Sequence, residues 1–134
     1  MWVFNIKDED GSPRYKARLV AKGCAQRPGL DYSDTFAPVA KMTTIRSMLS
    51  VAVKKNLIVH QMDVKTAYLN GNLNEEIFMK LPLNTNGKWN LYILNKSIYG
   101  LKQAGRSWNF KFNEIITNYG FKKLTSDSCL YFCG

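Results

Sequence analysis

The sequence predicts a mixed α+β fold, because strand-like and helix-like patterns both occur along its 134 residues. Near the N-terminus, residues 2–7 and 15–22 alternate with a period of two around a polar turn. Residues 43–55 and 105–119 instead space their apolar side chains three and four apart, as helices do. A chain of this length can bury about two-thirds of its unfolded surface, so it can form a core.

Residues 2–23 are predicted to form a β-hairpin. The first strand places three apolar residues on one face: Trp2, Phe4 and Ile6. The returning strand carries Tyr15, Ala17, Leu19 and Ala21 on one face and Lys16, Arg18, Val20 and Lys22 on the other. Three cations on one face repel one another, so this face suits either a polyanionic ligand or a solvated edge strand.

The first helix is expected to begin at Thr43 or Thr44, either of which could cap its N-terminus. Its apolar stripe, which we expect to face a core, comprises Ile45, Met48, Leu49, Ala52 and Val53. The second helix is predicted over residues 105–119 and ends at Gly120. Its stripe comprises Trp108, Phe112, Ile115, Ile116 and Tyr119.

Residues 57–64 are expected to form a buried strand that ends in an acidic residue. Asp63 is the only carboxylate between Asp34 and Glu75. A carboxylate at the end of a hydrophobic strand is costly to bury unless a positive group compensates it. Asp63 is therefore either a hard oxygen ligand for Mg²⁺ or an aspartate that caps the following turn.

Further strands are expected in the second half of the chain. Residues 75–81 and 89–94 form a predicted hairpin around the turn signal Asn86-Gly87. Residues 129–133 begin another apolar strand. Together with the central strand, these segments predict an antiparallel sheet packed by helices.

The chain carries a net charge of +9, spread over both halves. Diffuse basicity favours a polyanionic partner, most simply nucleic acid, although an ordinary basic soluble protein has the same composition. Three cysteines without a Cys-x-x-Cys pair, and one histidine, argue against a zinc site and a disulfide framework. Reduced cysteines in an intracellular compartment are the simplest interpretation. The sequence contains no secretory signal pattern and no apolar run long enough for a membrane helix.

Two strings resemble catalytic-domain motifs of Ty1/copia-type retrotransposon reverse transcriptases: HQMDVKTAYLNG at 60–71 and LNKSIYGLKQAGRSW at 94–108. The strings at 15–23, 31–46 and 75–82 resemble the same family in the same order, so the resemblance covers nearly the whole chain. It implies a partial fingers–palm fold. Residues 1–40 would be a fingers-like hairpin and loop, and residues 41–134 a palm-like core, of a single incomplete reverse transcriptase domain.

The resemblance also implies a site for two-metal nucleotidyl transfer. Asp63 would bridge two Mg²⁺ ions, and the backbone carbonyl of Val64 would help to hold one of them. Ala67 would line the sugar pocket. The ring of Tyr68 would exclude a 2′-hydroxyl and thereby select deoxynucleotides, although a half-buried core aromatic fits the same position.

Nucleotide and nucleic-acid contacts follow from the same resemblance. Lys16 and Arg18 would bind the triphosphate of the incoming nucleotide. A second group would lie under the nascent base pair: Tyr99, Gly100 and Lys102. Lys96 and Arg106 cluster in sequence with Lys102 at the start of the second helix, where cations and free backbone amides favour a phosphate.

The family places two more metal-binding aspartates in a Tyr-x-Asp-Asp hairpin, whereas no Asp or Glu follows Asp127 here. One carboxylate cannot organise two Mg²⁺ ions. We therefore expect RNA-directed DNA polymerisation from the complete retrotransposon Pol polyprotein, acting on an RNA/DNA primer–template and deoxynucleoside triphosphates in a cytoplasmic particle or the nucleus. The isolated fragment is expected to be inactive. The alternative is a non-catalytic basic nucleic-acid-binding remnant or domesticated module.

Overall fold

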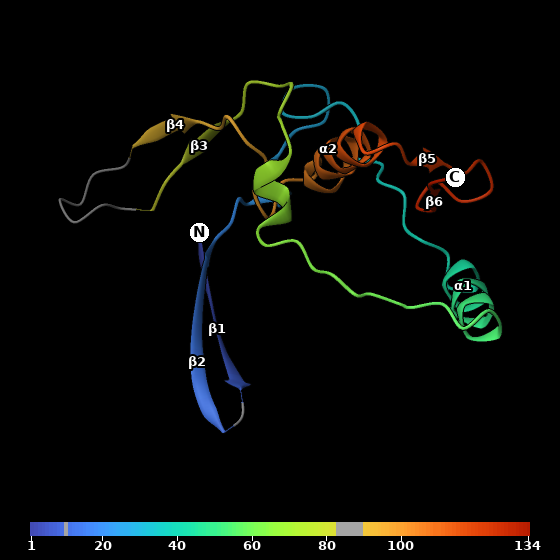
Figure 1. The fold of residues 1–134 in the computed structure, drawn as a ribbon. Helices are drawn as coiled ribbons and strands as arrows, with labels where there is room; N and C mark the ends of the chain where they lie inside the picture. Colours follow the sequence, from blue (N-terminus) through green and yellow to red (C-terminus); the bar gives the residue numbers. More distant parts are fainter. Residues whose placement is uncertain (10, 83–89) are drawn as a thin grey trace.

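The computed structural model describes residues 1–9, 11–82 and 90–134 (Figure 1). Within these residues, the helices are α1 (Met42–Lys54) and α2 (Ala104–Asn118), with short 3-10 turns η1 (Gly23–Ala25) and η2 (Ala67–Asn70). The strands are β1 (Trp2–Glu9), β2 (Ser12–Leu19), β3 (Phe78–Lys80), β4 (Leu91–Ile93), β5 (Lys122–Lys123) and β6 (Tyr131–Phe132). The predicted mixed α+β class is therefore confirmed.

The N-terminal hairpin forms as predicted. β1 and β2 pair antiparallel from Trp2 opposite Leu19 to Glu9 opposite Ser12, and the ribbon projects away from the rest of the chain (Figure 1). Opposed residues share a face of the ribbon. One face therefore carries the predicted cations, Lys16 and Arg18, and the other carries the exposed apolar side chains.

The core lies where η2, the start of α2 and the segment before it meet. Ile77, Leu101 and Ala104 are buried there. We call these three residues and the partly buried side chains around them the junction; the latter are Ala21, Tyr68, Leu73, Leu94 and Ile98. The junction draws on three separate parts of the sequence (residue 21, residues 68–77 and residues 94–104), so it holds together segments that are far apart along the chain.

Helix α2 matches its predicted range within one residue. The backbone N–H of Tyr119 bonds to Ile115 and Ile116, and Gly120 follows with a φ of +88°, which suits a glycine after a helix end. The rings of Trp108 and Phe112 lie 5.7 Å apart between centroids with their planes tilted by 49°, and Phe112 meets the ring of Tyr131 edge-on at 5.9 Å. The far half of the helix is thereby attached to the β5–β6 pair.

Helix α1 forms, but two predictions about it are wrong. Its N-cap is Lys41, so Thr43 and Thr44 lie inside the helix. The expected buried stripe is largely exposed, and only Ala52 is buried. Figure 1 shows the reason: α1 lies apart from the other elements, so no described segment covers its apolar side.

Residues 57–64 do not form the predicted buried strand. They run as an exposed, unpaired linker from α1 to η2 (Figure 1), and Ile58 is 85% exposed. A strand needs a neighbour for its backbone groups, and none of the described segments pairs with this one. The expected continuous sheet is accordingly replaced, within the described residues, by three separate two-stranded sheets.

The remaining strands agree in part with expectation. β3 and β4 pair with Met79 opposite Tyr92, which confirms the second hairpin, although both strands are shorter than predicted. The predicted turn at Asn86-Gly87 lies outside the described residues. β6 lies within the predicted apolar strand and pairs with β5. No described helix has the length and apolar character needed to span a membrane.

Candidate nucleotide and nucleic-acid site

Tyr68 and Tyr99 are brought together from two different motifs. Their ring centroids lie 4.4 Å apart with the planes tilted by 55°. Thr66, with a φ of +52°, turns the chain into η2, and the N–H of Gly71 closes this turn on the carbonyl of Tyr68 at 3.0 Å. Tyr68 is half-buried against the junction. Ala67 lies beside it, half-buried, in the same turn.

The segment after η2 is packed tightly on α2. Gly71 is buried, and a Cβ on it would lie 2.9 Å from the carbonyl carbon of Ser107, closer than side chains normally approach. The carbonyl of Gly71 accepts the N–H of Ser97 at 2.9 Å. The Lys96 ammonium donates to Oδ1 of Asn72, the residue after Gly71. Lys96 is therefore attached to the end of the first motif.

The turn at Tyr99 and Gly100 contacts the end of the N-terminal hairpin. The N–H of Ala21 donates to the carbonyl of Tyr99 at 2.8 Å. Gly100 has a φ of +94°, and a Cβ on it would overlap the carbonyl oxygen of Ala21. A Cβ on Gly23 would likewise overlap the carbonyl oxygen of Gly100. The segment that follows the strand of Lys16 and Arg18 is thus hydrogen-bonded to the Tyr99–Gly100 turn.

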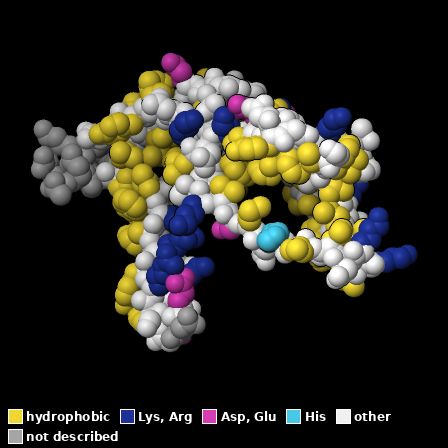
Figure 2. All heavy atoms as spheres, viewed as in Figure 1, with side chains coloured by type: hydrophobic (Ala, Val, Ile, Leu, Met, Phe, Trp, Pro, Cys, Tyr) yellow, Lys and Arg dark blue, Asp and Glu magenta, His cyan; other side chains and the backbone are white. Residues whose placement is uncertain are grey.

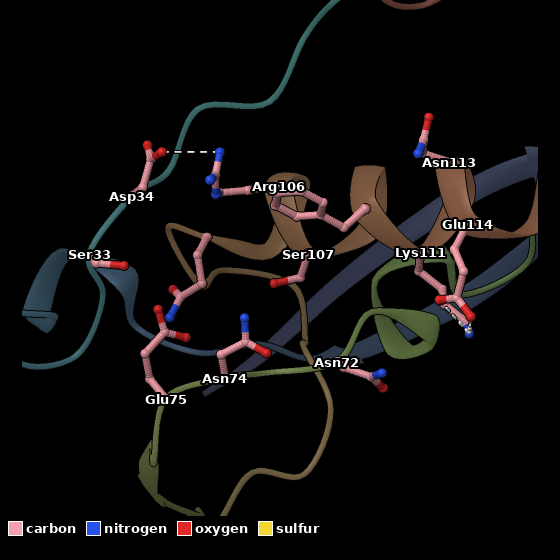
Figure 3. A pocket seen from close by; sticks show the side chains of 12 residues that line it. Ser33, Asp34, Asn72, Asn74, Glu75, Arg106, Ser107, Lys111, Asn113 and Glu114 are labelled. Atoms are coloured by element: carbon pink, nitrogen blue, oxygen red, sulfur yellow. Dashed lines mark hydrogen bonds and ion pairs between the residues drawn. The ribbon is translucent and has the colours of Figure 1, made fainter. Parts of the chain in front are cut away.

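The cations predicted to bind the nucleotide and nucleic acid lie in different surroundings. Lys16 and Arg18 remain half-exposed on β2, where Lys and Arg side chains gather along the hairpin (Figure 2). The Lys102 ammonium lies 5.3 Å from the ring centroid of Tyr32. Figure 3 shows Arg106 directed at Asp34, at 3.0 Å. The predicted cluster of Lys96, Lys102 and Arg106 is therefore spread over separate contacts.

Arg106 already has several partners. Besides the ion pair with Asp34, it donates to the carbonyl of Phe36 at 3.3 Å and lies 4.7 Å from the ring centroid of Phe110. The N–H of Phe36, together with the nearby Arg106, holds the pKa of Asp34 below its usual value of 3.8. Arg106 therefore joins the loop at residues 33–36 to α2, in addition to any role in nucleic-acid binding.

Asp63 and Val64 lie in the exposed linker that precedes η2. Within residues 1–9, 11–82 and 90–134, no three His, Cys, Asp or Glu side chains come together as a metal site requires. Asp63 and the Val64 carbonyl supply two oxygen donors, which falls short of what a pair of Mg²⁺ ions needs. The residues described here therefore do not by themselves fit the two-metal site that the resemblance implies.

A polar pocket of about 550 Å³ opens beside α2 (Figure 3). Its lining comes from three segments and includes Ser33, Asp34, Asn72, Asn74, Glu75, Arg106, Ser107, Lys111 and Glu114. Of these residues, sequence reasoning had assigned a role in binding only to Arg106. The other lining residues come together because residues 71–75 pack against α2 and Arg106 joins the loop at residues 33–36 to the same helix.

Two glutamines that sequence reasoning missed support the second motif. Gln26 accepts the N–H of Lys102 on its Oε1 at 2.7 Å, and its Nε2 donates to Oε1 of Gln103 at 3.1 Å. Gln103 in turn donates to the carbonyl of Asp31 at 2.9 Å. Because these bonds cross more than 70 residues of sequence, no local pattern could have indicated them.

The comparisons with known proteins agree with the motif resemblance. A family model described as reverse transcriptase (RNA-dependent DNA polymerase) matches residues 1–134. The Pol polyprotein of transposon TNT 1-94 from Nicotiana tabacum is 49% identical over 98% of this chain and 10% of its own length. That of transposon RE2 from Arabidopsis thaliana is 45% identical over 97% of this chain and 9% of its own length.

A more distant relative is the transposon Ty1-ER2 Gag-Pol polyprotein of Saccharomyces cerevisiae, which is 33% identical over 98% of this chain and 7% of its own length. No solved structure gives a significant match. The chain spans about a tenth or less of the length of these curated relatives. It belongs to the reverse transcriptase family, and its relatives are the Pol polyproteins of copia- and Ty1-type transposons.

Proposed function

We propose that this chain forms part of the fingers and palm of a copia-type Pol polyprotein and serves RNA-directed DNA polymerisation there. Residues 1–40 would be the fingers-like part and residues 41–134 the palm-like part. The observation that carries the proposal is the contact between Tyr68 and Tyr99, at 4.4 Å between ring centroids. The two tyrosines come from the two motifs that most resemble the family, and a nucleotide needs sugar and base contacts side by side.

The proposed nucleotide site extends from this contact in two directions. Tyr68 and Ala67 in η2 would receive the sugar, with the Tyr68 ring excluding a 2′-hydroxyl. Tyr99, Gly100 and Lys102 would lie under the nascent base pair. Lys16 and Arg18 would bind the triphosphate, and the bond from the Ala21 N–H to the Tyr99 carbonyl supports this because it joins their strand to the turn.

Members of the reverse transcriptase family use divalent metal ions, and we propose Mg²⁺ for this one. Asp63 would supply a carboxylate and Val64 a carbonyl oxygen. The other ligands would come from parts of the longer polyprotein that lie outside residues 1–134. The 134-residue chain alone is therefore expected to make no DNA, since its described residues form no group of three His, Cys, Asp or Glu side chains that could hold a metal.

One observation favours a second function, that of a non-catalytic nucleic-acid-binding module. Asp63 is exposed, and the described residues contain no group of three His, Cys, Asp or Glu side chains that could hold a metal, whereas the chain keeps a net charge of +9. Such a module would bind primer–template weakly and without sequence preference. Its affinity should fall steeply with salt, with a slope of about −0.7 to −0.9 in log K against log salt for each phosphate neutralised.

A chimera tests which function holds. In it, these 134 residues replace the matched segment of the TNT 1-94 Pol polyprotein, and DNA synthesis is measured on a primed RNA template, with the unmodified tobacco polyprotein as positive control. We expect DNA synthesis that Asp63→Asn abolishes, because a neutral amide cannot replace a shared metal-binding charge. Tyr68→Ala should keep synthesis and admit ribonucleotides. Full activity with Asp63→Asn, or polymerisation by the 134-residue chain alone, would contradict the proposal.

The binding function is measured on the 134-residue chain itself. Its affinity for a labelled RNA/DNA primer–template is determined over a series of salt concentrations. The non-catalytic reading predicts salt-dependent binding by the chain together with no synthesis by the chimera. No binding even at low salt would remove that reading.

A further inference from the structure

Gln26 holds the backbone of the second motif from a distant part of the chain. Its Oε1 accepts the N–H of Lys102 at 2.7 Å, and its Nε2 donates to Oε1 of Gln103 at 3.1 Å. Nε2 of Gln103 then donates to the carbonyl of Asp31 at 2.9 Å. The two amides therefore form a chain of three hydrogen bonds between one backbone donor and one backbone acceptor.

This chain of bonds allows one orientation of each amide. A backbone N–H can only donate and a carbonyl oxygen can only accept, so Gln26 must present its oxygen to Lys102 and Gln103 must present its nitrogen to Asp31. Gln103 is 2% exposed, which makes an unsatisfied amide there costly. The side chain of Gln26 is consequently fixed in position by its two hydrogen-bond partners, the Lys102 N–H and the Gln103 side chain.

The loop that carries Gln26 also positions the side chain of Lys102. Tyr32 lies on this loop, and its ring centroid is 5.3 Å from the Lys102 ammonium. The loop is closed by bonds of its own, from the N–H of Gly29 to the carbonyl of Tyr32 at 2.8 Å and from the N–H of Arg27 to Asp31 at 2.7 Å. Both the backbone and the cation of Lys102 are thus set by residues 26–32.

We propose that Gln26 is a positioning residue for nucleotide binding. It does not touch the nucleotide; it fixes the Tyr99–Lys102 turn, on which the nascent base pair would lie. The inference rests on the proposed function, because it assumes that Tyr99, Gly100 and Lys102 contact the nucleotide. A purely structural role makes a different prediction: loss of Gln26 would then lower the folded fraction, and with it kcat, at an unchanged nucleotide KM.

The test uses variants of the same chimera. Gln26→Met keeps the size of the side chain and removes both hydrogen bonds. Gln26→Glu keeps the acceptor for the Lys102 N–H and removes only the donor to Gln103, so it separates the two bonds. The matched control is Asn113→Leu, which breaks a bond of similar length, 3.0 Å from the Tyr131 hydroxyl, at the other end of α2. For each, the nucleotide KM, kcat, primer–template affinity and unfolding temperature are measured.

We expect Gln26→Met to raise the nucleotide KM about fivefold or more, the size of one lost hydrogen bond, with primer–template affinity unchanged. Gln26→Glu should raise the KM less than Gln26→Met, because it keeps the bond to the Lys102 N–H, and Asn113→Leu should not change the KM. Should Gln26→Met fail to fold, Gln26→Asn is measured instead, since it withdraws the acceptor by one methylene and keeps the amide.

Three results would overturn the inference alone: an unchanged KM in Gln26→Met, equal KM increases in the Met and Glu variants, or a loss confined to kcat. An unmodified chimera that makes no DNA, beside an active tobacco control, would overturn the proposed function and this inference with it. The two failures are therefore distinguishable, because only the second concerns the chimera without any Gln26 change.

Discussion

The junction and the segment from α1 to η2 differ sharply although both are rich in apolar residues. In the junction, Ile77, Leu101 and Ala104 are 5%, 7% and 2% exposed. In the second region, which we call the arm (residues 42–66), Val53 is 82% and Ile58 85% exposed. Apolar composition alone therefore does not bury a segment. The junction is buried because three separate segments meet there, whereas most of the arm is exposed.

The two regions also differ in how their backbones are held. Bonds between distant residues cross the junction, from Ala21 to Tyr99 and from Ser97 to Gly71. The residue immediately before the arm, Lys41, is held instead by a bond from its N–H to Asp127 at 3.2 Å. Residues 58–64 have no backbone hydrogen bond to another described residue. Local opening should therefore cost little free energy in the arm and much in the junction.

The largest expected effect is that of Gly100→Ala. Gly100 has a φ of +94°, and an added Cβ would overlap the carbonyl oxygen of Ala21. Left-handed strain and forced displacement of backbone together should lower the free energy of unfolding by about 3 kcal/mol or more. Urea unfolding of the 134-residue chain, followed by circular dichroism, measures the change.

Gly120→Ala is the matched control. Gly120 has a similar φ of +88°, but nothing lies within 4 Å of an added Cβ. Only the left-handed strain remains, so the loss should be about 1 kcal/mol. Equal losses in the two variants would mean that the contact between Gly100 and Ala21 does not hold the hairpin to the junction.

The second prediction compares one isoleucine from each region. Ile77→Ala removes a side chain that is 5% exposed, and the cavity it leaves should cost about 2 to 5 kcal/mol. Ile58→Ala makes the same chemical change at a residue that is 85% exposed, so it should cost no more than about 0.5 kcal/mol. Unfolding free energies from urea titration test both. A loss at Ile58 as large as that at Ile77 would show that the arm is packed.

The same contrast explains which parts of the fold the sequence could predict. The hairpin at residues 2–23 and helix α2 depend on local patterns, alternation in one case and an apolar stripe with a closing glycine in the other, and both were predicted correctly. Residues 57–64 carry a strand-like pattern as well. Their strand requires hydrogen bonds from another segment, which a single sequence cannot reveal, and no described segment supplies them.

The candidate site residues also divide into those that local motifs indicate and those that depend on contacts between distant segments. Tyr68 and Tyr99 could be named from motifs, and the structure brings them into contact. That Arg106 would be paired with Asp34 could not be foreseen, since the two are 72 positions apart in the sequence. Gln26 gave no signal either, because its role depends on the backbone of Lys102. The residues of local motifs could be predicted from the sequence, whereas hydrogen bonds and ion pairs between distant residues could not.

The third prediction concerns the bond that attaches the arm. Buried Asp127 accepts the N–H of Cys129 at 2.9 Å as well as that of Lys41, and a bond from the Thr44 side chain contributes most to holding its pKa below 3.8. Asp127→Ala should free the first turn of α1, so its amide hydrogens should exchange roughly tenfold faster while those of the junction change little.

The pH dependence of this contact has a definite sign. Because the pKa of Asp127 is lower in the folded chain, its stabilising effect is fully present above pH 3.8 and is lost as the pH falls through the folded-state pKa. The stability difference between the wild-type chain and Asp127→Ala should therefore shrink on acidification. A difference that is the same at pH 7 and well below pH 3.8 would mean that the charge on Asp127 is not involved.

The smallest expected effect is that of Glu9→Gln at the tip of the hairpin. Glu9 and Arg14 form an ion pair at 3.0 Å, but their side chains are 51% and 64% exposed. Water and salt screen such a pair, so its loss should change the free energy of unfolding by no more than about 0.5 kcal/mol, and by less at high salt. Urea titrations at low and high salt would check both statements. A larger effect that persists in high salt would place the hairpin tip against another part of the chain, and the hairpin would then resemble the junction more than the arm.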